Sequence, residues 1–277
     1  MHISQRLGFG IKGPEDKFST LEDIISQIDI KTKRVGKPYF PTVGNIQVEP
    51  WPDKFQFSLK ERIEYARLYR KGRNSIREST HLSKQDEKQK VRALKRKLQV
   101  WRFDQVGLAH QAVYGNDPVR QRLMQFWWNH FTIGSTNGTN FYTGDLYWNE
   151  LNKGIDGHFS SLLYNVTKHP SMLTYLDNVY SVGENSKKGL NAKKNKNKKI
   201  RVGLNDNLAR ELLELHSVSP SRNYTENDIR ETAKILSGWG YIFNKTQKET
   251  SKINYPTDHA NAFIQEHHEP GGEVCSW

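Results

Sequence analysis

The sequence predicts a mainly α-helical protein, a multi-helix domain with long irregular loops, and three observations lead to this prediction. Capping patterns that begin helices recur along the chain, and apolar residues follow them three and four positions apart. No alternation of strands and helices and no phosphate-binding glycine loop appears. With 35% hydrophobic and 11% aromatic residues, the 277-residue chain has enough large side chains for a core.

Two capping patterns predict the first two helices. Ser19 and Glu22 have the serine-to-acid spacing of a capping box, and Ser58 and Glu61 repeat it. Apolar residues at helical spacing follow both pairs. We expect the second helix to end at Gly72, because glycine readily adopts the left-handed conformation that closes a helix.

Further elements follow along the first half of the chain. Prolines and scattered aromatic residues predict an irregular segment over residues 35–57. One apolar stripe over residues 83–112 predicts a single long helix. Asp117 followed by Pro118 predicts the start of another helix, which ends in the aromatic run FWWNHF at residues 126–131.

The second half alternates loops and helices. Glycine, threonine and asparagine predict a loop over residues 133–144. A helix is expected over residues 159–166, and Pro170 stops it and begins the next one. Residues 205–217 and 225–238 predict two helices joined by a short turn, which together form a helical hairpin. Thr225 and Asp228 have the capping-box spacing at the start of the second helix.

Composition excludes several kinds of protein. The single cysteine, Cys275, rules out an intramolecular disulfide and a cysteine-rich metal site. The first residues lack the apolar run of a secretory signal, and no stretch approaches the length of a membrane-spanning helix. The sequence as written therefore predicts a cytoplasmic location and no transmembrane segment.

The net charge of +12 is concentrated in one segment. Eight lysine and arginine residues fall between positions 187 and 201 with no acidic residue among them, and we expect a lysine-rich loop over residues 183–204. A solvated connector is the favoured interpretation, because like charges repel and no aromatic residue is present to stack on bases. The alternative is a loop that binds a polyanion or nucleic acid through Lys193, Lys194, Lys196, Lys198 and Lys199.

The stretch NDNLARELLELHSVSPSRNYTENDIRETAKILSGW, at residues 205–239, resembles the signature of the bacterial family named domain of unknown function 1800. Further matches in the same order cover nearly the whole chain: RLGFG at 6–10, FWWNHF at 126–131, FSSLL at 159–163 and HPSMLTYLDN at 169–178. The resemblance implies a large helical domain, often in proteins predicted to be exported, with no established activity. Asp206 and Ser219 depart from it, since glutamate and glycine are usual there.

The end of the chain departs further from the family pattern. The stretch AFIQEHHEPGGEVCSW at residues 262–277 begins like a family segment that has a histidine, an acid and a glycine, and its tail at 272–277 is unlike that segment. We therefore expect a truncated version of a larger helical domain, spanning residues 1–277 as a single unit. A naturally short variant is the alternative.

The predicted helix at 205–217 carries the densest set of reactive groups. Its candidate catalytic residues are Arg210, Glu211, Glu214 and His216. Arg210 and Glu214 are four apart and can form an ion pair on one face. The other interpretation is a structural polar network between packed helices, because the spacing of His216 is not that of a di-iron helix bundle.

The candidate metal ligands are His130, Asp177, His267 and His268, because imidazole and carboxylate groups bind zinc and iron. Each also has a structural interpretation. His130 lies in the last turn of a helix, where a cation is favourable, and Asp177 suits a helix cap. Adjacent histidines such as His267 and His268 seldom face one ion. A divalent metal is therefore one cofactor that the sequence allows, and none is required.

Three functions are consistent with these features. The first is a helical accessory protein that interacts with another protein. The second is a metal-assisted hydrolase in which the ion activates water. The third is a polyanion or nucleic-acid binder that uses the lysine-rich loop. No residue spacing requires catalysis, so the sequence favours the first function without deciding whether the protein is an enzyme.

Overall fold

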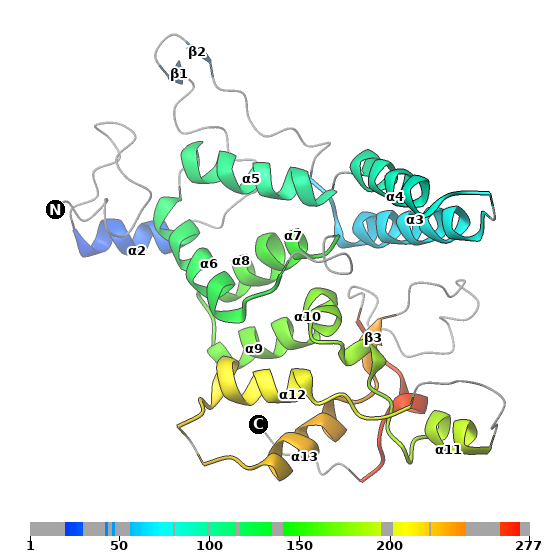
Figure 1. Cartoon of the computed structure of the whole chain (residues 1–277). Coiled ribbons are helices and arrows are strands. Elements are labelled where there is room, and N and C mark those ends of the chain that lie inside the picture. The colour runs from blue at the N-terminus through cyan, green and yellow to red at the C-terminus, as the bar shows by residue number, and fades with distance from the viewer. Residues whose placement is uncertain are drawn as a thin grey trace. The chain divides into compact units, whose positions relative to one another are not determined.

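A computed structural model describes residues 20–29, 42–43, 46–47, 56–79, 81–98, 100–114, 117–134, 141–194, 202–221, 223–241 and 261–271. This part of the chain is mainly helical, with only short strand pairs, which confirms the predicted fold class (Figure 1). The chain divides into two compact units: unit 1 is Met1–Asn129 with Asn140–Leu162, and unit 2 is His130–Thr139 with Leu163–Trp277. That the whole chain acts as a single domain stays a prediction. None of the described helices has the length and apolar character needed to cross a membrane.

Unit 1 contains most of the long helices. They are α2 (Leu21–Asp29), α3 (Leu59–Glu78), α4 (Lys84–Leu98), α5 (Val100–Tyr114) and most of α6 (Pro118–Phe131). Three short helical segments follow one another: α7 (Thr143–Asp145), the π-helix η3 (Leu146–Leu151) and α8 (Asn152–Gly154). Strands β1 (Thr42–Val43) and β2 (Ile46–Gln47) form an antiparallel pair inside the segment that the sequence predicts to be irregular.

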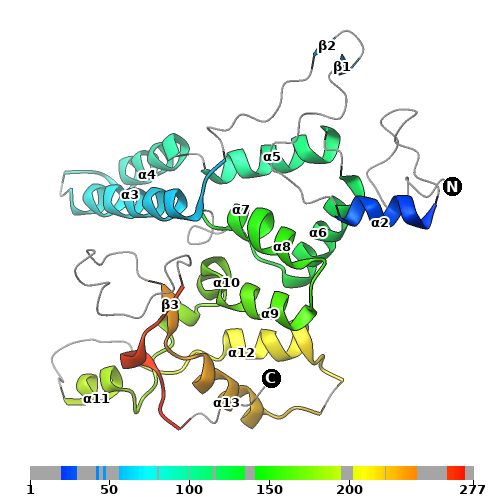
Figure 2. The same ribbon diagram turned by 180° about the vertical axis from the view of Figure 1, so that it is seen from behind.

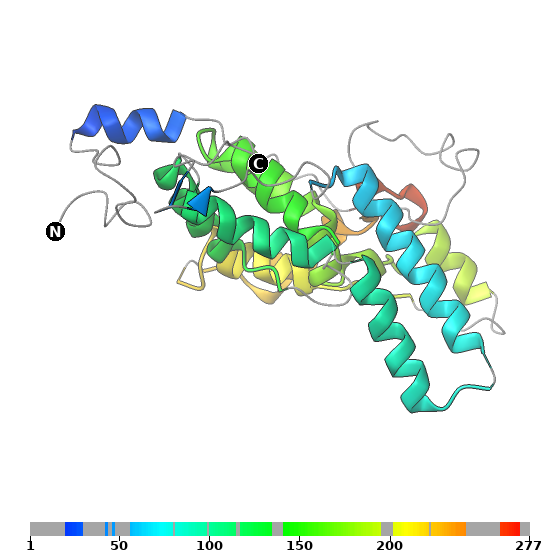
Figure 3. The ribbon, with the colours of Figure 1, turned by 90° about the horizontal axis from the view of Figure 1, so that it is seen from above.

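Helices α3 and α4 lie side by side as a helical hairpin (Figure 3). The capping box of Ser58 and Glu61 is confirmed at the start of α3. The predicted end at Gly72 is wrong, because α3 continues to Glu78. Gly72 instead allows close approach of the two helices, since a Cβ atom there would lie 2.7 Å from a methyl carbon of Leu94.

Two other helix predictions need correction. The single helix predicted over residues 83–112 is two helices, α4 and α5. The apolar periodicity continues from one to the other, so periodicity alone does not reveal where the chain changes direction. The first capping box is shifted by one residue from Ser19 and Glu22: Thr20 and Asp23 exchange the two capping hydrogen bonds, at 3.0 and 3.1 Å.

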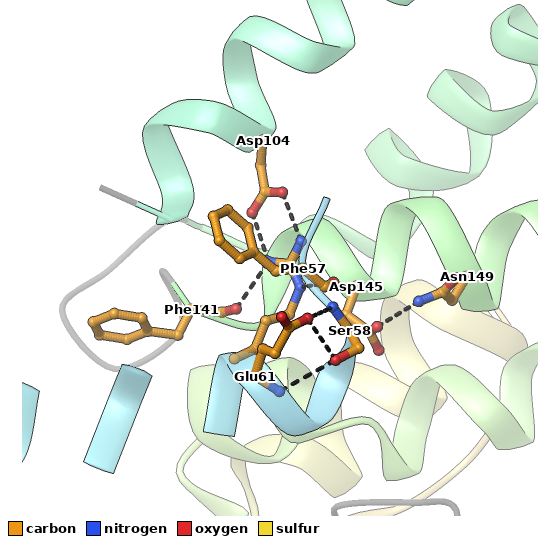
Figure 4. A network of polar contacts seen from close by, with 8 residues as sticks. Phe57, Ser58, Glu61, Asp104, Phe141, Asp145 and Asn149 are labelled. Atoms are coloured by element: carbon orange, nitrogen blue, oxygen red, sulfur yellow. Dashed lines mark hydrogen bonds and ion pairs between the residues drawn. The ribbon is translucent and has the colours of Figure 1, made fainter. Parts of the chain in front are cut away.

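A buried ion pair joins the elements of unit 1. Arg62 of α3 is 0% exposed and bonds both carboxylate oxygens of Asp104 on α5, each at 2.7 Å. Two further N–H groups of Arg62 donate to the carbonyl oxygens of Phe57 and Phe141, both at 3.0 Å (Figure 4). Gly144 leaves room for the pair, because a Cβ atom there would lie 2.1–2.3 Å from the Asp104 carboxylate group.

A second buried network connects α5, α6 and η3. The Asp117 carboxylate accepts hydrogen bonds from the amide groups of Gln111, at 2.8 Å, and Gln121, at 3.0 Å. The Tyr147 hydroxyl donates to the Gln121 carbonyl oxygen at 3.2 Å. Burial, with the nearby Asp117 carboxylate, raises the pKa of Tyr147 above its usual range, so this hydroxyl stays protonated. Helix α6 begins at Pro118 as predicted. The side-chain bonds of Asp117 fix this start against the neighbouring elements.

Unit 2 contains most of α9 (Phe159–Lys168), then α10 (Pro170–Tyr175), η4 (Asn178–Tyr180) and α11 (Lys187–Lys194). Next come α12 (Asn207–Glu211), which continues into the π-helix η5 (Leu212–Ser217), and α13 (Glu226–Leu236). Strands β3 (Trp239–Tyr241) and β4 (Asn261–Phe263) pair antiparallel, and η6 (Gln265–His267) follows. The predicted change of helix at Pro170 is confirmed, and the His169 side chain accepts the capping bond from the Ser171 amide.

The predicted helical hairpin in unit 2 is confirmed, with α12 beside α13 (Figure 2). The capping box of Thr225 and Asp228 begins α13. The π-helical turn of η5 is a feature that the sequence does not predict. At its end, the amides of Val218 and Ser219 both donate to the Leu213 carbonyl oxygen at 3.0 Å.

The lysine-rich segment is not a loop throughout. Residues Lys187–Lys194 form helix α11, which packs against η6. A Cβ atom at Gly189 would lie 2.3 Å from the Gly183 carbonyl oxygen, so the absent side chain permits the close turn before this helix. Local charge repulsion is outweighed here by tertiary contacts.

Replacing Asp104 by asparagine should strongly destabilise unit 1. The Asp104→Asn variant keeps the side-chain shape and leaves the buried Arg62 guanidinium without its compensating charge. We expect the free energy of unfolding to fall by about 3–5 kcal/mol, measured by urea denaturation with circular dichroism. Glu64→Gln, which breaks the exposed pair with Arg67, is the control and should have little effect. A loss for Asp104→Asn no larger than that of the control would contradict the prediction.

Ser219→Gly should stabilise unit 2. Ser219 has φ of 75°, a left-handed conformation that is strained for residues other than glycine, and its exposed hydroxyl contacts the Ser221 hydroxyl at 3.3 Å. We expect the free energy of unfolding to rise by about 1 kcal/mol because the backbone strain is removed, and the rise would be measured from the midpoint of urea unfolding. Ser217→Gly should do the opposite, because Ser217 lies inside η5 and its hydroxyl bonds the Leu212 carbonyl oxygen. Destabilisation by both substitutions would be inconsistent with strain at Ser219.

Candidate functional site

Two histidines form a reciprocal contact in unit 2, between the end of α6 and η5. His130 Nε2 lies 3.1 Å from the His216 carbonyl oxygen, so this nitrogen carries the proton that is donated. The His216 ring in turn bonds the backbone of Phe131. The two imidazole rings are 6.2 Å apart, and His216 also contacts the Phe131 ring at 5.5 Å. The His130 ring thus bonds the backbone of His216, and the His216 ring bonds the backbone of the residue that follows His130.

His216 is buried and uncharged. Burial, helped by the nearby His130, lowers its pKa to about 4, although the bond to Phe131 partly opposes the shift. At neutral pH the ring is therefore a neutral group inside the unit.

Arg210 lies apart from this histidine contact. Its guanidinium bonds both carboxylate oxygens of Glu226 on α13, at 2.9 Å each, and the Asp206 carboxylate at 3.1 Å. These bonds raise the pKa of Arg210, and they lower the pKa of Glu226. The structure therefore connects Arg210 to α13 at the surface, whereas His216 faces inward. Glu211 and Glu214 lie half-buried on the same helical stretch and contribute to raising the pKa of Tyr224.

A third cluster, which we name the C-terminal clasp, joins Ser237, His268, Glu269 and Asn185. The Ser237 hydroxyl accepts from the Glu269 amide at 2.8 Å and donates to the Lys234 carbonyl oxygen at 2.6 Å. His268 Nδ1 lies 2.9 Å from the Ser237 carbonyl oxygen, so Nδ1 carries a proton that it donates to this oxygen. Since Nδ1 is a donor, it cannot accept the Ser237 proton 3.4 Å away, and the pair is not a nucleophile with its base.

The buried Glu269 carboxylate completes the clasp. Asn185 donates to it from the backbone amide, at 2.9 Å, and from the side-chain amide, at 2.5 Å. A Cβ atom at Gly183 would lie 2.2 Å from the same carboxylate, so glycine is needed for this approach. The sequence drew attention to the local cluster of His267, His268 and Glu269 as possible metal ligands. It did not connect Glu269 to Asn185, because the two residues are far apart in the chain.

His267 is oriented by a lysine rather than by another histidine. The Lys188 ammonium donates to His267 Nε2 at 3.1 Å, and burial lowers the pKa of Lys188. The neighbouring Lys187 is exposed and pairs with Glu266 at 2.8 Å, which raises the pKa of Lys187. Adjacent lysines thus have opposite environments at the contact between α11 and η6.

The four predicted metal ligands are not brought together as one set. His130 contacts His216, His267 contacts Lys188, and His268 contacts Ser237. Asp177 is exposed, with φ of 59°, at the start of η4. Within the described ranges, no group of three or more histidine, cysteine, aspartate or glutamate side chains has an arrangement that could hold a metal ion.

The predicted polyanion-binding residues are placed only in part. Lys193 and Lys194 are exposed at the end of α11. The other three lysines of that set, at positions 196, 198 and 199, lie outside the described residues.

A surface of unit 1 carries three aromatic side chains in contact, which we name the aromatic cluster: Phe126, Trp127 and Phe159. The Phe126 ring meets Trp127 edge-on at 5.1 Å, and Trp127 stacks on Phe159 at 5.4 Å. Phe126 is 59% exposed and Phe159 is 41% exposed. The motifs FWWNHF and FSSLL supply these rings, although their apolar character alone suggested a core.

Comparison with known proteins gives the family of the chain. The profile of the family described as "Protein of unknown function (DUF1800)" matches residues 2–274. The chain belongs to the DUF1800 family. This confirms the resemblance inferred from the motifs, and the DUF1800 description assigns no activity. No curated protein and no solved structure matches the chain.

The buried His216 predicts that this DUF1800 protein loses stability in mild acid. Its pKa is about 4 in the folded state, against 6.5 in the unfolded state. Between these values the unfolded chain binds more protons, so stability is complete above pH 6.5 and falls as the pH drops toward 4. The loss attributable to this ring should reach about 3 kcal/mol, measured by urea unfolding from pH 7.5 to 4.

Variants test this assignment. His216→Gln removes the titrating ring, so the fall in stability between pH 6.5 and 4 should be smaller than in the unmodified protein. His81→Gln, at an exposed position, should leave the pH dependence unchanged. Equal pH profiles for all three proteins would show that His216 does not control the transition.

Proposed function

We propose that the protein is a helical accessory protein that binds another protein, and that the aromatic cluster of unit 1 is its contact surface. The exposure of Phe126 and Phe159 carries this proposal. Large aromatic side chains are costly to leave in water, and exposed groups of them are typical of protein-binding surfaces.

The arrangement of the three rings supports the proposal. Trp127 contacts both phenylalanine rings, so the cluster is held in place before a partner arrives. A surface that is already ordered loses little conformational entropy on binding. The partner should therefore present a complementary apolar surface, on which the exposed Phe126 ring would be an anchor.

The two alternative functions have less support from the described residues. A metal-assisted hydrolase would need the separated His130, Asp177 and His268 to act at one ion. A polyanion binder would rely on Lys193 and Lys194 together with lysines outside the described residues. Both remain predictions from the sequence.

Photo-crosslinking at position 126 tests the proposed surface. A photoreactive phenylalanine analogue placed at Phe126 should give a discrete covalent adduct with one partner protein in cells. The matched control is the same analogue at Tyr180, an aromatic residue with 56% exposure in unit 2. The adduct should form at position 126 only, and Phe159→Ser should weaken it several-fold by removing one ring of the cluster. No adduct, or equal adducts at both positions, would count against the proposal.

A further inference from the structure

The ammonium group of Lys168 lies between two aromatic rings in unit 2. Its Nζ atom is over the Tyr164 ring, 3.7 Å from the centroid, and over the Trp239 ring, 4.9 Å from the centroid. Both distances are within the range of cation–π attraction. In the described part of the chain, Lys168 forms no ion pair with a carboxylate. Ring faces, rather than an opposite charge, hold this ammonium group.

The Trp239 ring is held in a fixed position. Trp239 lies in β3 directly opposite Phe263 of β4, and the two rings meet at 5.3 Å. Phe263 in turn contacts the His268 ring at 5.0 Å, which links Trp239 to the C-terminal clasp. The Asn178 side-chain amide also donates to the Trp239 carbonyl oxygen at 2.9 Å. The wall of the site is therefore preorganised.

The other side of the site is open to solvent. Tyr164 is 58% exposed and stands one helical turn before Lys168 on α9. Lys168 is half-buried on a long flexible stem, so its ammonium can leave the rings and reach water by rotation of its side chain. A cation from solution could then take its place.

We propose that Tyr164 and Trp239 form a binding site for a quaternary or methylated ammonium group, and that Lys168 occupies this site in the free protein. The two rings already bind one ammonium group in the structure. A primary ammonium is strongly hydrated and loses much on leaving water, whereas a methylated cation is weakly hydrated and has apolar surface that packs on the rings. This inference rests on residues of unit 2 and is independent of the proposed role of the aromatic cluster.

Titration with tetramethylammonium and choline tests the site in the full chain. Calorimetry at constant ionic strength, with sodium chloride as the reference salt, would measure the dissociation constants. Lys168→Gln should bind both cations about tenfold more tightly than the unmodified protein, because the internal competitor is gone. The matched control is Lys234→Gln, a half-buried lysine of the same unit that pairs with Glu231, and its affinity should be unchanged.

Two further variants decide whether the rings form the site. In the Lys168→Gln background, Trp239→Leu should abolish saturable binding. Tyr164→Leu should weaken it and, at an exposed position, should leave the circular dichroism spectrum unchanged, so it is decisive even where the tryptophan variant fails to fold. No saturable binding by Lys168→Gln, or binding of unchanged affinity after Tyr164→Leu in that background, would overturn the proposal.

Vesicles distinguish the source of the cation. Lys168→Gln would be sedimented with vesicles of phosphatidylcholine and, as control, of phosphatidylglycerol. Binding to phosphatidylcholine alone that is lost with Tyr164→Leu would identify a choline headgroup as the ligand. Binding of free choline without vesicle binding would identify a small soluble cation. Absence of both would overturn the proposal.

Discussion

A buried guanidinium must find an acceptor for the N–H groups that it removes from water, and this requirement organises unit 1. Arg62 meets it with the two oxygens of Asp104 and the carbonyl groups of Phe57 and Phe141. These acceptors come from the segment before α3, from α5 and from the segment before α7. Their positions therefore depend on one side chain, and Gly144 is glycine because the carboxylate fills the space of its Cβ atom. A buried charge of this kind contributes specificity more than net stability.

Unit 2 meets the same requirement with hydrogen-bond donors that are uncharged. The buried Glu269 carboxylate accepts hydrogen bonds from two N–H groups of Asn185. The Ser237 hydroxyl accepts a hydrogen bond from the Glu269 amide and donates one to the Lys234 carbonyl oxygen. His216 is kept neutral, so its burial costs little at physiological pH. Such bonds are short-ranged and directional. They hold η6 and the residues after it close to α11 and to the end of α13, and they bring together segments distant in sequence.

The sequence predicts best what is decided locally. The capping boxes at Ser58 and Thr225 involve residues three apart, and both are present in the structure. Partners 42 and 84 residues apart, as in Arg62–Asp104 and Asn185–Glu269, leave no local pattern. The π-helical turn of η5 is local, but no residue pattern marks the change from hydrogen bonds that close four residues on to bonds that close five residues on. The spacing of the candidate site residues is equally uninformative about their surroundings: Arg210 and His216 share one helical stretch, and their side chains have different partners.

The distribution of side chains also bears on the kind of function that this fold can have. Histidines that looked reactive in the sequence are engaged with backbone carbonyls and with Lys188, which fixes their tautomers and positions. Exposed aromatic rings, in contrast, occur on both units, at Phe126 and at Tyr164. A ring at the surface offers a face to a cation or an apolar partner without any change of protonation. Since the histidines of unit 2 named above are used for internal contacts, recognition through exposed rings is the chemistry that both proposals assign to these surfaces.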